Sequence, residues 1–173
     1  MRTVAVVLIA LGLFAAGVQA QLAPAQARPD FSGTWTFDQA KSSEPGPDGK
    51  VVVAAMLGDE CVMKQDATTL ALAIKFGGGL VNAAYKLDGS ESRNMSPSPA
   101  GEVTVISHAS WDAGKLIILS TSTQADGITV NTRRVFSIDA AGDLIIERTG
   151  TPASVVTPSR SVYHKARQSA PPA

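Results

Sequence analysis

The sequence predicts an all-β domain, a single antiparallel up-and-down β-barrel of about eight to ten strands, with a sandwich as the alternative. Short runs rich in Val, Ile and Thr alternate apolar and polar residues with a period of two, which is typical of half-buried strands. Glycine-bearing turns separate consecutive runs, as they do in antiparallel hairpins. We favour the barrel because closure removes the exposed edges that such strands would otherwise present.

The first twenty residues are predicted to be a secretory signal peptide outside this domain. Arg2 supplies a positive charge, Val4 to Val18 an apolar run, and Val18-Gln19-Ala20 a small-residue cleavage site. The run is about fifteen residues, shorter than the ~20 of a membrane span. We therefore expect cleavage after Ala20, export to the periplasm or the exterior, and no integral membrane segment afterwards. A retained amphipathic anchor is the alternative.

The domain is predicted to span residues 30–166, after a flexible Ala/Gln/Pro-rich linker over 21–29. Its first strand places Phe31, Trp35 and Phe37 on one face, and Gly33 leaves that face open to a close neighbour. Burying a tryptophan removes about 150–250 Å² from water, which at about 25 cal/mol per Å² gives at most about 4–6 kcal/mol. Trp35 is therefore predicted to seal one end of the core.

The remaining strands follow in order, joined mostly by short turns. They are predicted over 60–65, 70–76, 80–87, 103–111, 115–123, 128–138, 143–149 and 160–165. Loops are predicted over 41–50 and 152–158, and a long polar loop from Asp88 through Pro97 and Pro99 to Gly101. Only residues 51–57 suggest a short helical turn, and the Pro-rich tail over 167–173 is predicted to be disordered.

The balance of charged residues limits the classes of partner that the chain can attract. The 173 residues carry 15 basic and 15 acidic side chains, so no electrostatic case exists for nucleic acid or an anionic membrane. Cys61 is the only cysteine, so no internal disulfide can form. A lone cysteine of this kind is most often a small buried hydrophobic residue. We expect a monomer that folds on its core alone.

A series of short motifs resembles a known family. Gly33-Thr34-Trp35 resembles the G-x-W signature of the lipocalin and calycin barrels, and the chain looks most like exported lipocalin-like bacterial proteins that open with D-F-S-G-T-W. The shared segments continue with Lys64-Gln65-Asp66, Tyr85–Gly89, Trp111–Leu116 and Thr132–Leu144. The resemblance covers most of 30–165 and implies an eight-stranded barrel or a close variant, with an apolar interior ligand site. The chain departs from typical lipocalins in lacking a clear C-terminal helix and the usual disulfide.

Two arginines are predicted to point into the barrel. Arg134 shares parity with Val130 and Phe136, and Arg148 falls in line with apolar residues of the next strand. A buried guanidinium needs a partner. By the resemblance, one of them packs over Trp35 as a cation–π pair; the alternatives are a counter-ion for a fatty-acid-like carboxylate and an exposed, snorkelling arginine.

Four aromatic residues are candidates to line a ligand cavity or to fill the core: Phe76, Tyr85, Trp111 and Phe136. Catalytic motifs for hydrolysis, phosphate binding or dinucleotide binding are absent from the sequence. His108 and His164 are the only histidines and lack metal-ligand spacing with Cys61. We therefore expect no catalytic residue, no metal and no cofactor.

Three functions stay open from the sequence. The first is a secreted or periplasmic lipocalin-like barrel that binds a small hydrophobic molecule without catalysis. The second is an envelope-associated structural or interaction module that works through its surface and the 90–101 loop. The third is a hydrolase or isomerase, which requires His108 or His164 in a cleft beside an acid or a hydroxyl.

Overall fold

The computed structural model describes residues 27–42, 54–76, 78–98 and 101–166. The predicted signal peptide, the linker up to residue 26 and the tail over 167–173 lie outside these residues, as does most of the predicted 41–50 loop. Residues 54–57 of the predicted helical turn form no helix.

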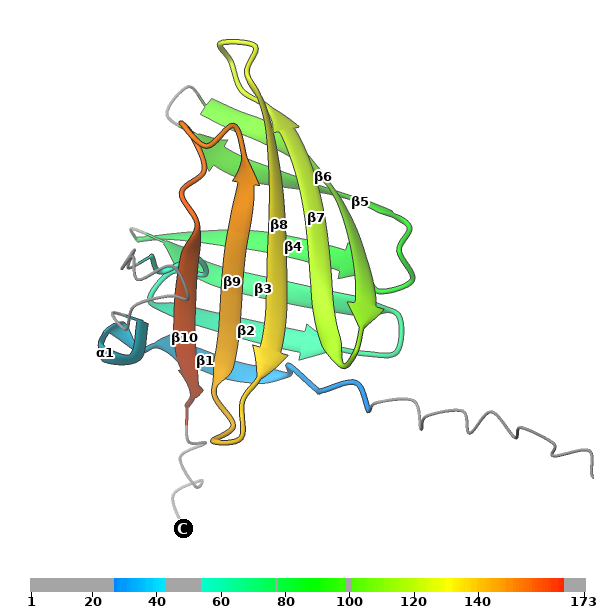
Figure 1. Ribbon diagram of the computed structural model, residues 1–173, viewed down its shortest axis with the longest axis vertical. Helices are drawn as coiled ribbons and strands as arrows, with labels where there is room; N and C mark the ends of the chain where they lie inside the picture. The colour runs from blue at the N-terminus through cyan, green and yellow to red at the C-terminus, as the bar shows by residue number, and fades with distance from the viewer. Residues whose placement is uncertain (1–26, 43–53, 77, 99–100, 167–173) are drawn as a thin grey trace, which may run out of the picture.

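The described residues form ten antiparallel strands and one short helix, which confirms the all-β barrel (Figure 1). The elements are β1 (Gly33–Phe37), α1 (Gln39–Ser42), β2 (Glu60–Gln65), β3 (Thr69–Phe76), β4 (Gly79–Lys86), β5 (Glu91–Ser98), β6 (Gly101–Asp112), β7 (Lys115–Thr123), β8 (Thr129–Ile138), β9 (Leu144–Thr151) and β10 (Ser159–Lys165). Their spatial order is β4-β3-β2-β1-β10-β9-β8-β7-β6-β5. Pairing of β1 with β10 joins the first and the last strand, so the sheet wraps into a barrel that is nearly closed.

The seam of the barrel lies between β4 and β5, which are consecutive in the chain but are the two ends of the sheet. Side chains of β5 bridge it. The backbone N–H of Ala84 donates to Asn94 Oδ1 (2.8 Å), and Asn94 Nδ2 donates to the Ala84 carbonyl (3.1 Å). The backbone N–H of Lys86 donates to Ser92 Oγ (2.9 Å). These bonds satisfy β4 backbone groups at its free edge.

Strand β5 corrects the sequence prediction of a long loop through Pro97 to Gly101. It pairs with β6 over its whole length, from Glu91 opposite His108 to Ser98 opposite Gly101. Its inward positions are occupied by hydroxyl and amide side chains, so the strand carries no apolar alternation. That is why its sequence pattern is typical of a loop.

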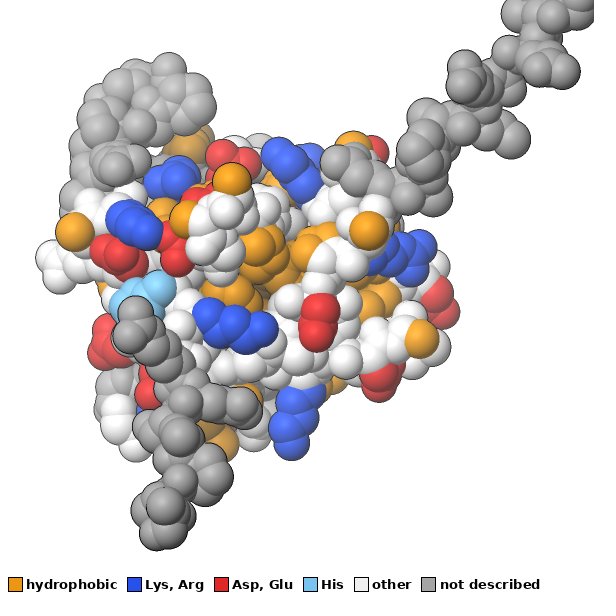
Figure 2. Space-filling view, turned by 90° about the horizontal axis from the view of Figure 1, so that it is seen from below, with side chains coloured by type: hydrophobic (Ala, Val, Ile, Leu, Met, Phe, Trp, Pro, Cys, Tyr) orange, Lys and Arg blue, Asp and Glu red, His pale blue; other side chains and the backbone are white. Residues whose placement is uncertain are grey.

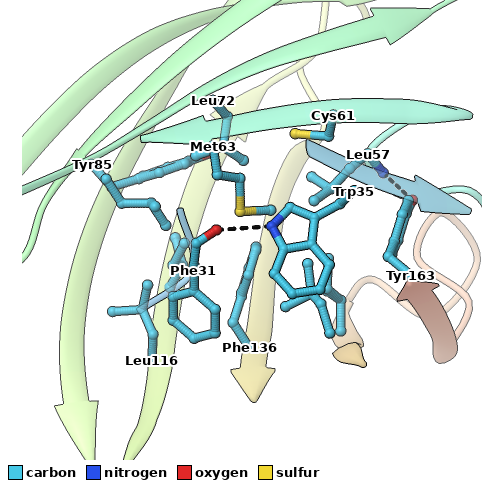
Figure 3. Packing of buried hydrophobic residues seen from close by; sticks show 14 of the residues in the cluster. Phe31, Trp35, Leu57, Cys61, Met63, Leu72, Tyr85, Leu116, Phe136 and Tyr163 are labelled. Carbon is cyan, nitrogen blue, oxygen red and sulfur yellow. Dashed lines mark hydrogen bonds between the residues drawn. The ribbon is translucent and has the colours of Figure 1, made fainter. Parts of the chain in front are cut away.

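The D-F-S segment closes one end of the barrel. Phe31 is fully buried, and its carbonyl accepts a hydrogen bond from Trp35 Nε1 (2.8 Å; Figure 3). Its ring stacks on Trp111 at 5.9 Å and meets Phe136 edge-on at 6.0 Å. The Phe31 N–H donates to Gln65 Oε1 (3.1 Å), which ties the segment to β2. We call the half of the barrel around these rings the closed half.

Gly33 makes room for a lysine rather than for a ring or a backbone. Its φ is +139°, and a Cβ added there would lie 2.5 Å from Lys165 Cε. The Lys165 Nζ lies 5.4 Å from the centre of the Trp35 ring. The cation–π partner of Trp35 is therefore Lys165 of the last strand, and the prediction of Arg134 or Arg148 in this place is wrong.

The core of the closed half is apolar and well connected. Tyr163 holds the segment before β2, since its phenol accepts from the Leu57 N–H (2.7 Å; Figure 3) and donates to the Gly58 carbonyl (3.2 Å). Cys61 is a free, fully buried thiol, and burial raises its pKa to about 12. Its chemical behaviour in the folded protein is that of a small hydrophobic side chain.

The surface carries charges of both signs. In the view from below, Lys, Arg, Asp and Glu side chains lie interspersed around a central group of apolar side chains (Figure 2). Within the described residues, no helix has the length and hydropathy that a membrane crossing requires.

Candidate ligand-binding cavity

A cavity of about 360 Å³ occupies the other half of the barrel, nearer the β7–β8 turn. We call this the open half. The volume exceeds the about 300 Å³ at which small-molecule sites begin. Two walls of different chemistry face each other across it. The apolar wall includes Met56, Ile74, Phe76, Val81 and Ala83, and the polar wall includes Ser120, Ser122, Thr132, Arg134 and Arg148.

The polar wall is built by cross-strand neighbours on three adjacent strands. Arg134 of β8 is the direct partner of Arg148 on β9. One inward position further along β8, Thr132 is the partner of Ser120 on β7. Ser120 in turn shares a hydrogen bond of 2.9 Å with Ser107 of β6. Because inward residues recur every second position, the arginines and the hydroxyls form two neighbouring rows on one wall.

Arg134 is anchored to the opposite side of the barrel through Tyr85. Its Nη2 donates to the Tyr85 phenol (2.8 Å), and its guanidinium carbon lies 5.5 Å from the centre of that ring. The Tyr85 ring is buried on β4, so the contact fixes the guanidinium inside the barrel. A cation–π contact of this kind contributes about 0.5–2 kcal/mol.

Both guanidiniums keep unused hydrogen-bonding capacity. The Nε atoms of Arg134 and Arg148 are buried and have no hydrogen-bond partner among the described residues. Burial, and after it the neighbouring Arg134 charge, lowers the pKa of the Arg148 guanidinium. None of the described residues that line the cavity is an Asp or a Glu. This half-buried positive pair is therefore suited to an anion, since unpaired buried charge is costly.

The predicted site residues divide between the two halves. The structure brings Arg134, Arg148, Tyr85 and Phe76 together around the cavity. Phe76 lies at its edge, with 56% of its surface exposed. The other two aromatic candidates belong to the closed half: Phe136 is fully buried there, and Trp111 lies beneath the Arg28 guanidinium at 5.4 Å. Gly33 and Trp35 likewise lie in the closed half, as structural residues.

Sequence reasoning missed the hydroxyl row and the β5 side of the cavity. Ser120 and Ser122 share the parity of Leu116 and Ile118, which are fully buried. Their position in this inward-facing series was the signal in the sequence that could have placed them in the cavity. On β5, Asn94 lines the cavity as well as bridging the seam.

Within the described residues, neither histidine forms a hydrogen bond or an ion pair with an acid or a hydroxyl. His108 is exposed, and its Nδ1 lies 3.0 Å from the Gly89 carbonyl. His164 is exposed beside a surface depression in which the Asp143 carboxylate is engaged by Lys41. No group of three His, Cys, Asp or Glu side chains in the described part of the chain is placed to hold a metal ion. The hydrolase or isomerase hypothesis gains no support from this geometry.

Comparisons with known proteins agree on the fold. No protein-family model and no curated protein matches the chain. Among solved structures, the chain is similar to apo lipid binding protein 8 of Caenorhabditis elegans, with a TM-score of 0.51 and 16% identity over 79% of this chain and 95% of that one. It is also similar to secretory abundant heat soluble protein 4 of Ramazzottius varieornatus, with a TM-score of 0.52 and 15% identity over 84% of this chain and 100% of that one. At these identities the likeness establishes the barrel fold.

Proposed function

We propose that this protein binds a small lipophilic molecule with an anionic end inside its barrel, without catalysing a reaction. The observation that carries the proposal is the pair of guanidiniums of Arg134 and Arg148 in a cavity whose opposite wall is apolar. The Nε atom of each is buried and has no partner in the part of the chain that the structure describes. The anionic end lies against the arginines, and the apolar body lies against Ile74, Val81 and Ala83.

The two arginines have hydrogen-bond donors that a ligand can use. A guanidinium that loses water without gaining a partner is destabilising, whereas a charge-assisted bond to a carboxylate is about twice as strong as a neutral one. A carboxylate bound beside the two guanidiniums, which both line the cavity, gains charge-assisted hydrogen bonds from them. The name of the C. elegans neighbour, a lipid binding protein, is consistent with such a ligand in a barrel of this shape.

Dodecanoate is a suitable probe because it joins a carboxylate to a single apolar chain. We expect calorimetric titration to show binding of dodecanoate, weaker binding of the uncharged dodecanol, and a loss of about tenfold or more in dodecanoate affinity for Arg134→Met, since a lost charged hydrogen bond is worth about 1.5–3 kcal/mol. Arg133→Met is the matched control, because Arg133 is the exposed neighbour on the same strand. Equal affinities of the two variants would contradict the proposal.

The setting of this function is part of the proposal. We propose that residues 1–20 direct export and are removed after Ala20, and that the mature protein works as a monomer in the periplasm or outside the cell. The apolar run from Val4 to Val18 and the small-residue cleavage site support this. Intact mass of the protein from the exported fraction, together with light scattering, tests both points. A mass that retains residues 1–20 would contradict cleavage.

An envelope-associated interaction module is the second candidate. Its supporting observation is exposed apolar surface at the β3–β4 turn, where Phe76 is 56% and Leu80 61% exposed. The predicted 90–101 loop no longer contributes, because residues 91–98 form β5. The variant Leu80→Ser separates the candidates, because Leu80 is exposed and does not line the cavity: an interaction module loses its association with the envelope fraction, whereas a carrier keeps its affinity for dodecanoate.

A further inference from the structure

We infer that the headgroup taken by this cavity is a dianion, of the class of phosphate monoesters that carry one apolar chain, and that a monocarboxylate is the weaker ligand. The inference rests on the proposed function, because it specifies the headgroup that the same cavity binds.

The cavity carries two positive charges close together. Arg134 and Arg148 are directly opposite each other on β8 and β9, and both line the cavity. Like charges in directly opposite positions of an antiparallel pair are destabilising. The described lining residues include no carboxylate that could offset them. One monocarboxylate neutralises half of this charge, whereas a dianion neutralises all of it.

The cavity also holds several hydrogen-bond donors. Both guanidiniums line it, their Nε atoms have no partner among the described residues, and the Tyr85 phenol accepts from Arg134, which leaves its own proton free to donate. Thr132 adds a hydroxyl one inward position away, and its cross-strand partner Ser120 adds another when Ser107 donates to it. These donors come from five side chains. A carboxylate offers two oxygens to them, and a phosphate monoester offers three terminal oxygens.

The size of the cavity limits the apolar part of the ligand. The cavity measures about 360 Å³, near the lower end of the range of about 300–1,000 Å³ for small-molecule sites. Its apolar wall has three small or medium side chains from β3 and β4: Ile74, Val81 and Ala83. One chain fits this space better than two.

Three amphiphiles with the same dodecyl chain test the inference on the mature full-length protein. Dodecanoate is a monocarboxylate, dodecyl sulfate a tetrahedral monoanion, and dodecyl phosphate passes from one charge toward two between pH 5 and pH 8, because its second pKa is about 6. We expect dodecyl phosphate to bind about tenfold more tightly at pH 8 than at pH 5, equivalent to one pKa unit of coupling. Dodecyl sulfate keeps its charge and reports any titration of the protein itself, so its affinity should not rise.

Variants locate the effect. Arg148→Met should abolish the gain of dodecyl phosphate at pH 8 and leave binding of the monoanions through Arg134, whereas Arg148→Lys should retain part of the gain. Arg133→Met, on the exposed face of β8, should behave as the wild type. Circular dichroism verifies that each variant is folded, and the wild-type pH comparison stands even if a variant is not.

The outcomes separate this inference from the proposed function. If dodecanoate binds and dodecyl phosphate at pH 8 binds no more tightly than dodecyl sulfate, the dianion is refuted and the proposed function stands. If none of the three amphiphiles binds, both fall. If inorganic phosphate alone binds as tightly as dodecyl phosphate, the apolar chain contributes nothing and the lipophilic class is refuted.

Discussion

Replacing Trp35 with phenylalanine isolates the hydrogen bond of the opening motif from the burial of its ring. Trp35 is 1% exposed, and its Nε1 donates to the Phe31 carbonyl over 2.8 Å within the closed half. Phenylalanine keeps an aromatic ring but has no donor. The Phe31 carbonyl is then left buried without this partner, at a cost of about 1–3 kcal/mol. A smaller ring also leaves a cavity, which adds to the loss.

Trp111→Phe is the control that makes the same truncation at the half-buried tryptophan stacked on Phe31. Both substitutions make the same change in ring size, but the Trp111 Nε1 is buried with no hydrogen-bond partner among the described residues. Trp111→Phe therefore removes an unsatisfied donor, and phenylalanine can keep the stacking on Phe31 at 5.9 Å between ring centres. We expect Trp35→Phe to be less stable than Trp111→Phe by about 1–3 kcal/mol, the penalty of the orphaned carbonyl.

Urea unfolding followed by far-ultraviolet circular dichroism measures this difference without depending on tryptophan fluorescence, which both variants alter. Equal m-values would show that the two variants differ in stability and not in the compactness of their unfolded states. If Trp111→Phe costs as much as Trp35→Phe, the bond between Trp35 and Phe31 contributes no net stability, and the account of the opening motif is refuted.

Three further predictions concern other parts of the barrel. Gly33→Ala is expected to lower the midpoint of thermal unfolding, because the added Cβ would lie 2.5 Å from Lys165 Cε and the backbone has a φ of +139°. Adding Lys165→Ala should recover only the loss caused by the steric contact, and a wild-type midpoint for Gly33→Ala alone would contradict the prediction. Asn94→Ala is expected to speed hydrogen exchange at the Ala84 amide, whose acceptor is Asn94 Oδ1 at 2.8 Å, relative to other amides of β4; unchanged exchange would show that the seam does not depend on this side chain. Burial raises the pKa of the Cys61 thiol from 9.0 to about 12, so the folded protein holds a proton that the unfolded chain releases above about pH 9. The free energy of unfolding should then fall as pH rises between these values, by at most about 1.4 kcal/mol per pH unit from this group, and Cys61→Ala should show a shallower fall in urea titrations.

The fold was predictable wherever a strand has one apolar and one polar face. The predicted 60–65 and 115–123 strands coincide with β2 and β7, because apolar residues alternate there toward a buried interior. The glycine-bearing turns located the hairpins between them. Helix α1 was missed because it is four residues long, too short for a period of 3.6 to emerge.

The cation that packs over Trp35 could not be identified from the alternation of residues along the strands. Parity assigned Arg134 and Arg148 to the inner face, and the structure places both there. It gives no depth along the barrel, however, and both arginines lie in the open half while Trp35 lies in the closed half. Lys165, directly opposite Trp35 in the pairing of β1 with β10, takes the position instead. Register across the closing pair was needed, and periodicity alone does not supply it.

The failure to predict β5 and the chemistry of the cavity have one physical cause. In the closed half, inward positions hold side chains such as Leu70, Leu116 and Phe136, which stabilise the barrel by burial. In the open half, inward positions on β5, β7 and β8 change to Asn94, Ser120 and similar polar residues. Such residues weaken a core and remove the alternation by which strands are recognised. A barrel that needed only stability would carry apolar residues there, so this departure from the pattern supports the proposal of a ligand site in the open half.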